Sequence, residues 1–385
     1  MKKLHHVALL IETSNAYARG VLEGIVSYIH EHDPWSIYLP EQERGAKPPS
    51  WIKDWRGDGL IVRIETEEIA KTIKRLNKPV VDVSAARRVE GIPWVETNDH
   101  AIAQLAVEHF TSRGFKNLAF CGDPDFNWSR WREEGFIEET QTRPDLHCNY
   151  FTATSRTLPH YSWNREKNRL AKWIESLPKP VGIFACYDIR AQQVLDICRE
   201  QAIDVPDEVA VLGVDNDELL CNLCYPPLSS VIPDAYRTGR EAAKLLDRMM
   251  NGGEMREERH LIEPLGVATR QSSDVLAIED PDIATAIRFI RENACEGINV
   301  KDILKQVPMT RRAFELRFHA LLGRTPHQEI IRQRVERVKR LLIETDLPLK
   351  TIARNTRFEH EEYMSVVFRR ATGMPPGQYR QSRNQ

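Results

Sequence analysis

The chain has 385 residues, of which 41% are hydrophobic and 29% are charged, values ordinary for a globular protein of two or three domains. No apolar run approaches the roughly 18 residues that a membrane-spanning helix needs, so we expect no membrane protein. Lys2 and Lys3 could open a signal peptide, but Glu12 ends the short apolar run Val7–Ile11. We interpret that run as a first buried strand and expect a cytoplasmic protein.

Charge is distributed unevenly along the chain. Residues 283–385 carry 20 Lys and Arg against 11 Asp and Glu, whereas residues 1–282 carry 34 against 45. A basic region joined to an acidic one is typical of a phosphate-binding module beside a domain that does not bind nucleic acid.

Short apolar runs alternate with amphipathic stretches from residue 6 to about 265. The predicted strands are Val7–Ile11, Gly59–Ile64, Pro79–Val83, Asn117–Gly122, Val181–Cys186 and Val209–Val214. The predicted helices between them are Ala16–Glu31, Asp99–Arg113, Trp163–Leu177, Ile189–Gln201 and Asp234–Met250. This alternation predicts an α/β fold with parallel sheets covered on both faces, and its length suits two similar lobes.

The seven cysteines do not form a metal-binding pattern. Cys221 and Cys224 make one CxxC, but no second ligand pair stands at matching spacing, so we expect neither a metal nor a cofactor. Cys121 and Cys186 lie in apolar runs, where reduced cysteine acts as a small hydrophobic residue.

A polar segment, residues 271–282, separates the α/β pattern from purely helical periodicity. We therefore predict an α/β domain at residues 1–270, a linker at 271–282 and an all-α domain at 283–385.

The all-α domain contains an internal repeat. Asn299 can cap one helix and Thr310 a second that stops at Gly323, while Thr325, Pro326 and Gln328 form a capping box for a long third helix. Phe318, Gly323 and Pro326 recur as Phe368, Gly373 and Pro376, each shifted by fifty positions. The repeat predicts two helix-turn-helix units joined by one helix of about 19 residues.

The spacing of the two units suits double-stranded DNA. The joining helix would be roughly 28 Å long, so the second helix of each unit could enter successive major grooves about 34 Å apart. The candidate contact residues at the first unit are Thr310, Arg311, Arg312, Glu315 and His319, because arginine can bond guanine and glutamate can accept from cytosine. Those at the second unit are His360, Glu361, Arg369 and Arg370. For Glu361 and Glu362 a solubilising role remains an equal alternative, since acidic residues oppose the phosphate field.

Residues 299–381 resemble the AraC-type DNA-binding domain. The resemblance rests on Thr310–Phe318 as first recognition helix and, in the second unit, on Ile352, Ala353, Phe358, Tyr363, Phe368, Gly373, Pro376 and Tyr379. The family usually has glycine before the aromatic residue at Phe358, where this chain has Arg357. A glycine suits a turn with positive φ, so we expect this turn to be strained in the second unit.

The first part of the chain resembles LacI-type sensor domains, which close two α/β lobes over a sugar. The resemblance rests on Arg113-Gly114-Phe115, Arg132–Phe136 and Val211–Asn216. A sensor of this type followed by an AraC-type module resembles sugar-responsive activators, with D-xylose as the implied effector. It also implies a homodimer and contact with RNA polymerase.

Planar polar groups at strand ends and nearby aromatic faces are the candidate sugar ligands. The residues are Ser14, Asn15, Trp128, Arg132, Asp188, Asp215 and Asn216. Asp215 could instead be a turn residue, Ser14 and Asn15 a loop and helix cap, and Trp131 competes with Trp128. Ser84-Ala85 and Pro233 stand where related sensors often carry charged or amide groups, so we expect fewer charged groups around the sugar.

The sequence leaves two other functions open. Asp188 and Asp215 could form a carboxylate pair for glycoside hydrolysis, but no nucleophile elbow, metal spacing or phosphate loop supports an enzyme. The first domain could also serve only to dimerise a purely architectural DNA binder. The leading prediction is a sugar-responsive transcription regulator, with another pentose as the alternative effector.

Overall fold

The structure is a computed structural model and describes residues 4–41, 47–253, 259–275, 280–345 and 347–381. Contacts within the chain divide it into two units, residues 1–275 and 276–385. Among the described residues, no helix is both long enough and apolar enough to cross a bilayer.

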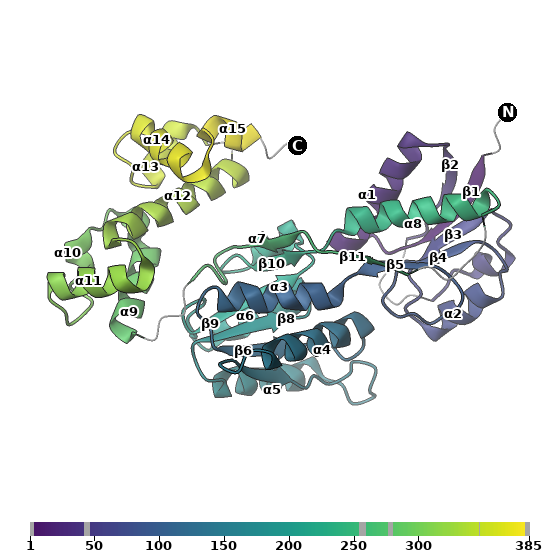
Figure 1. The fold of residues 1–385 in the computed structure, drawn as a ribbon, viewed down its shortest axis with the longest axis horizontal. Coiled ribbons are helices and arrows are strands. Elements are labelled where there is room, and N and C mark those ends of the chain that lie inside the picture. The colour runs from purple at the N-terminus through teal and green to yellow at the C-terminus, as the bar shows by residue number, and fades with distance from the viewer. Residues whose placement is uncertain (1–3, 42–46, 254–258, 276–279, 346, 382–385) are drawn as a thin grey trace. The chain divides into compact units, whose positions relative to one another are not determined.

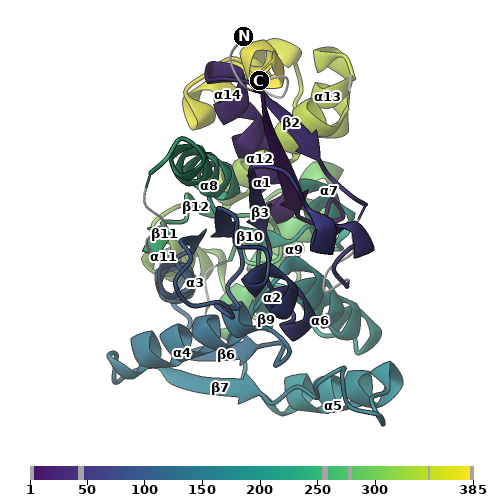
Figure 2. The ribbon, with the colours of Figure 1, turned by 90° about the vertical axis from the view of Figure 1, so that its right-hand side faces the viewer.

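The first unit contains two sheets, one in each lobe (Figures 1 and 2). The first sheet is parallel and has the order β11-β5-β4-β3-β1-β2. Its strands are β1 (His5–Leu10), β2 (Trp35–Tyr38), β3 (Gly59–Val62), β4 (Val80–Asp82), β5 (Trp94–Thr97) and β11 (Arg259–Ile262).

Helix α1 (Ala16–Glu31) and helix α8 (Ala235–Met250) pack together on one face of this first sheet. Their backbones meet at glycines: a Cβ on Gly24 would lie 2.0 Å from the Tyr236 carbonyl oxygen, and one on Gly239 would lie 1.9 Å from that of Val21. The other face of the sheet is covered by η1 (Ser50–Asp54) and α2 (Glu67–Lys74). Since α8 and β11 come late in the sequence, the first lobe is built from two separate stretches of chain.

The second sheet has the order β12-β10-β9-β8-β6-β7, and only β12 runs antiparallel to its neighbour. Its strands are β6 (Asn117–Cys121), β7 (His147–Phe151), β8 (Val181–Ala185), β9 (Val209–Val214), β10 (Ser229–Ile232) and β12 (Gly266–Ala268). Its helices are α3 (Asp99–Thr111), α4 (Asn127–Gln141), α5 (Trp163–Ser176), α6 (Asp188–Glu200) and α7 (Glu218–Leu223). Every residue of β8 and β9 is buried, as expected for the central strands of a sheet covered on both faces.

The predicted α/β class is confirmed, and every strand and helix predicted in this unit is present with ends within about two residues. Strands β2, β5, β7, β11 and β12 were not predicted. In β7 three of the five residues are exposed, so it has no apolar run for the sequence to show.

The end of the first unit is anchored in its own core. The Ser272 hydroxyl donates to the Val211 carbonyl at 2.6 Å and accepts from the Ser229 N–H at 2.8 Å. Ser272 and Ser273 are both fully buried. The start of the predicted linker 271–282 therefore lies within the core of the first unit, while Asp280 caps the first helix of the second unit.

The second unit is entirely helical over its described residues. It comprises α9 (Pro281–Asn293), η2 (Ala294–Glu296), α10 (Val300–Ile303), α11 (Arg311–Leu322), α12 (Pro326–Glu344), α13 (Leu349–Asn355), α14 (Glu361–Thr372) and α15 (Pro376–Gln381). Thr310 caps α11, Gly323 ends it in the left-handed conformation, and Thr325 with Gln328 forms the capping box of α12, as predicted. Two separate cores form, one around Phe314 and Phe318 and one around Met364 and Phe368, so the fifty-residue repeat is a structural repeat.

Candidate functional site

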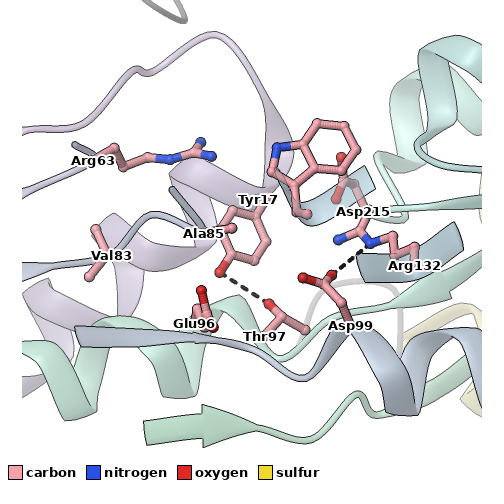
Figure 3. A pocket seen from close by; sticks show the side chains of 10 residues that line it. Tyr17, Arg63, Val83, Ala85, Glu96, Thr97, Asp99, Arg132 and Asp215 are labelled. Atoms are coloured by element: carbon pink, nitrogen blue, oxygen red, sulfur yellow. Dashed lines mark hydrogen bonds and ion pairs between the residues drawn. The ribbon is translucent and has the colours of Figure 1, made fainter. Parts of the chain in front are cut away.

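A small chamber in the first unit gathers polar groups from both lobes (Figure 3). The first lobe contributes Tyr17, Arg63 and Thr97, and the second contributes Trp128, Arg132 and Asp215. The chamber has a cavity volume of about 40 Å³, which is room for about three water molecules.

Arg132 is the most firmly held of these side chains. Its Nε donates to Asp99 Oδ1 at 2.8 Å, its Nη1 donates to the Cys186 carbonyl at 2.5 Å, and its guanidinium lies 4.9 Å from the centre of the Trp128 ring. Burial lowers the pKa of Arg132, but the neighbouring Asp99 and Asp215 carboxylates raise it further, so the net shift is upward. The guanidinium is therefore a fixed, fully charged donor whose remaining N–H groups can bond to a ligand.

On the other side of the chamber, Arg63 forms ion pairs with Glu12 and with Glu65, the latter at 2.7 Å. Nearby, Thr97 donates a hydrogen bond to the Tyr17 hydroxyl at 3.1 Å. Burial raises the pKa of Tyr17, so its hydroxyl remains a neutral donor and acceptor.

Asp188 shapes the loop that carries Asp215. Its carboxylate accepts from the Ser230 hydroxyl at 2.6 Å and from the Asp217 N–H at 2.9 Å. Gly213 is required beside it, because a Cβ there would lie 2.3 Å from Asp188 Oδ1. Burial and the charge of Asp215 raise the pKa of Asp188. Asp215 itself has a φ of +108°, an unusual conformation that this network holds in place.

A large chamber of about 760 Å³ shares Asp215 with the small one. It is also lined by Ser14, Asn15 and Asp188. Asn15 caps α1 through Ala18 N–H at 2.8 Å, so the predicted cap interpretation is confirmed and coexists with its place in the lining.

The predicted sugar ligands are therefore divided between the two chambers, with one exception. Asn216 lines neither, because its Oδ1 accepts from Arg270 and its N–H donates to Ser230. Five charged side chains line the small chamber, namely Arg63, Glu96, Asp99, Arg132 and Asp215, and the expectation of fewer charged groups than in related sensors stays a prediction. Arg63 had a visible signal, a charge inside the apolar run Gly59–Ile64, whereas Tyr17 and Asp99 lie on ordinary amphipathic helices.

An arginine contacts both lobes beside the small chamber. Arg87 lies between two indole rings, 4.2 Å from Trp94 of the first lobe and 4.2 Å from Trp131 of the second, and it pairs with Glu96. Trp131 therefore contacts Arg87 of the other lobe, while Trp128 lines the small chamber.

In the second unit, the predicted DNA contacts of the first recognition helix α11 are accessible. Thr310, Arg311, Arg312 and His319 are exposed, and Arg311 Nε donates to Glu315 at 2.8 Å across one helical turn. Leu316 is 64% exposed on the same helix, and its repeat equivalent Val366 is 67% exposed on α14. These two apolar positions were not predicted, although apolar side chains can contact thymine methyl groups.

The second recognition helix α14 begins after His360, which is exposed together with Arg369 and Arg370, while Glu361 is half-buried. Arg357 in the preceding turn has a φ of +55°, which confirms the expected positive φ at this position. Arg334 of α12 donates to the Arg357 carbonyl at 3.1 Å and to the Ala294 carbonyl at 2.8 Å, and so connects the two helix-turn-helix units.

Comparisons with known proteins agree with this architecture. Family models match as a XylR N-terminal domain at residues 6–99, a periplasmic binding protein-like domain at 107–273 and a helix-turn-helix domain at 303–382. The xylose operon regulatory protein of Escherichia coli K12 is 33% identical over 98% of this chain and 97% of its own length. The chain belongs to the xylose operon regulatory protein family.

Other members of the family match at similar length. The xylose operon regulatory protein of Haemophilus influenzae is 29% identical over 98% of this chain and 99% of its own. A solved structure described as the xylose-binding transcription activator xylR matches with a TM-score of 0.80 and 30% identity, covering 99% of each chain. Outside the family, a ribose-bound LacI family regulator from Enterococcus faecium matches 71% of this chain and 99% of its own with a TM-score of 0.57 and 18% identity, which shows a shared fold. The family is one of DNA-binding transcription regulators, so the predicted regulator, and not the enzyme, is the correct class.

Proposed function

We propose that this regulator is controlled by D-xylose, which binds between the two lobes of the first unit. The observation that carries the proposal is the small chamber, which both lobes line with hydrogen-bonding groups and to which Trp128 contributes an indole ring. Full-length relatives named for the xylose operon support the choice of sugar.

In this proposal Arg132 and Asp215 bond sugar hydroxyls and Trp128 packs against the C–H face of the ring. Asp99 and Asp188 act mainly by positioning them, since Asp99 holds Arg132 and Asp188 holds the loop of Asp215. Ser14 and Asn15 contact the sugar from the large chamber. Asn216 remains a weaker candidate, because its side chain is bonded to Arg270.

The regulator would act in the cytoplasm as a homodimer. Its second unit would place α11 and α14 in successive major grooves, with Thr310, Arg311, Arg312, Glu315 and His319 at one groove and His360, Glu361, Arg369 and Arg370 at the next. Sugar binding would favour one arrangement of the lobes and so change how the dimer meets its promoter and RNA polymerase.

A DNA-binding titration tests the proposal. The full-length protein is mixed with a labelled fragment of the promoter region beside its own gene, with and without D-xylose, L-arabinose or D-ribose. We expect D-xylose to change the affinity or the size of the complex, and Arg132→Lys to abolish that response while leaving sugar-free DNA binding intact. An identical titration in all sugars would refute the sugar control, and a response to another pentose alone would replace D-xylose as effector.

A further inference from the structure

The space between the lobes exceeds what one pentose ring requires. Arg132 and Asp215 line the small chamber, and Asp215 also lines the large chamber, so the two spaces meet at this carboxylate. The large chamber, at about 760 Å³, lies in the range of roughly 300–1,000 Å³ typical of sites for drug-sized ligands. Most of that volume lies beyond the reach of a single ring.

Aromatic rings continue from the first chamber into the second. Trp128 lines the small chamber, and the Phe126 ring stacks on it with centroids 5.0 Å apart and planes 18° apart. The Tyr187 ring meets Trp128 edge-on at 5.5 Å. Phe126 and Tyr187 both line the large chamber, with the Arg156 guanidinium 5.7 Å from the centre of the Phe126 ring, so aromatic surface continues past the first ring mainly at Tyr187.

The charges of the large chamber select a neutral ligand. Six carboxylates and two guanidinium groups line it. Arg88 pairs with Glu67, and Arg156 pairs with Asp123 and Asp125. Two arginines outside the lining, Arg63 and Arg19, pair with Glu65 and Asp217, and carboxylates still outnumber arginines in and around the chamber. An anionic ligand such as a sugar phosphate would meet a negative potential, whereas hydroxyl groups can donate to the carboxylates.

We propose that the large chamber is a second sugar subsite, and that the ligand class includes a neutral pentose disaccharide or short glycoside. One ring is held at Arg132 and Asp215, and the next packs against Phe126 and Tyr187. This inference rests on the proposed function, because it takes the small chamber as the subsite of the first ring.

Calorimetric titration of the full-length protein with D-xylose, its β-1,4-linked disaccharide and ribose 5-phosphate tests the inference. We expect the disaccharide to bind about tenfold more tightly than D-xylose, equivalent to about 1.4 kcal/mol, and the phosphate not to bind. Binding of D-xylose without binding of the disaccharide would overturn the second subsite alone. Binding of neither sugar would overturn the proposed D-xylose control as well.

Two substitutions that fill the large chamber from different elements locate the second ring. Thr157→Trp on the loop and Ile189→Trp on α6 should remove the advantage of the disaccharide and leave D-xylose affinity within about twofold. Leu158→Trp is the matched control, because Leu158 neighbours Thr157, is 52% exposed and does not line the chamber. If either filling variant that folds weakens both sugars equally, the large chamber belongs to the first ring and the second subsite does not exist.

Discussion

Arg132 and Asp99 form a buried ion pair in which each side chain depends on the other. Arg132 is 5% exposed and Asp99 is 5% exposed, so neither charge has access to bulk water. Removing one member of such a pair leaves an uncompensated buried charge, whereas removing both leaves none.

We expect Arg132→Met to lower the free energy of unfolding by about 3–5 kcal/mol, and the double variant with Asp99→Asn to recover most of that loss. Urea denaturation of the parent, the two single variants and the double variant measures both values. A loss below about 1 kcal/mol for Arg132→Met would mean that the pair behaves like one exposed on the surface.

His109 should make the stability of the first unit fall in mild acid. Its Nε2 hydrogen-bonds with the Ser273 hydroxyl at 2.7 Å, and burial, with a smaller effect of Arg113, lowers its pKa to about 3 from an ordinary value of 6.5. Between these two values the unfolded chain binds a proton that the folded chain does not. The stability that depends on neutral His109 is therefore fully present above pH 6.5. As the pH decreases below that value, the free energy of unfolding falls by up to about 1.4 kcal/mol per pH unit.

In His109→Gln, which can still bond Ser273, the free energy of unfolding should fall less between about pH 7 and about pH 5 than in the parent. His100→Gln is the control, because His100 lies on the same helix and its side chain is 56% exposed. Equal slopes in the two variants would show that His109 does not contribute to the acid sensitivity.

At the scale of elements, Arg87 joins the loop before β5 to helix α4 of the other lobe. Its guanidinium lies between Trp94 and Trp131, and the Asn127 side chain of α4 donates to the Ala86 carbonyl at 3.3 Å. These contacts join the two lobes, so we expect them to stabilise this arrangement of the lobes.

Arg87→Ala should weaken D-xylose binding roughly 2- to 30-fold, since cation–π contacts contribute about 0.5–2 kcal/mol. Calorimetry measures the affinity, and small-angle scattering of the sugar-free protein should show a larger radius of gyration. Arg75→Ala, an exposed arginine at the end of α2, is the control. An unchanged affinity and radius would mean that the arginine does not hold the lobes together.

The turn before α14 combines strain with a backbone anchor. Arg357 has a φ of +55°, while its carbonyl accepts from Arg334. We expect Arg357→Gly to raise the free energy of unfolding of the second unit by about 0.5–1 kcal/mol. Glycine has no Cβ atom and adopts this conformation without steric strain, and the greater chain entropy that it loses on folding offsets only part of this gain. Thermal unfolding measures the change, and a destabilised variant would show that the arginine side chain has a structural role that outweighs the strain.

The elements that could be predicted were those with one clear apolar period. Strand β9 was predicted with both ends correct, because all six of its residues are apolar or glycine and buried. Strand β5 was not, because it is short and its buried Glu96 is compensated by Arg87, a partner invisible in a linear pattern.

The site was predictable in the same uneven way. Residues at the ends of long strands, such as Asp215, were identified, and Arg132 came from family resemblance. Asp99 and Tyr17 were missed because their burial depends on how the two lobes meet, and local periodicity contains no information on that contact.

At the scale of the whole molecule, the length of α12 sets the distance between the two recognition helices. The helix has 19 residues and is therefore about 28 Å long. Arg334 in α12 bonds carbonyl groups of both helix-turn-helix units and so connects them. We therefore expect two half-sites on one face of the DNA, about one helical turn apart.

Inserting about 5 bp between the half-sites should reduce the affinity to that of a single half-site, and inserting about 10 bp should not restore it, because α12 cannot extend. Fluorescence anisotropy with the three DNA fragments measures this. Arg312→Ala, which we expect to weaken the first unit alone, provides the reference for binding through the second. Full affinity for both altered fragments would mean that α12 does not impose the spacing.

The buried Ser272 and Ser273 determine where the sensor can be cut and joined to something else. A sensor truncated at Arg270 would lose hydroxyls that bond β9, β10 and α3, whereas one ending at Val275 keeps them. A chimeric reporter that exchanges the DNA-binding module for another effector should therefore place its junction after Val275.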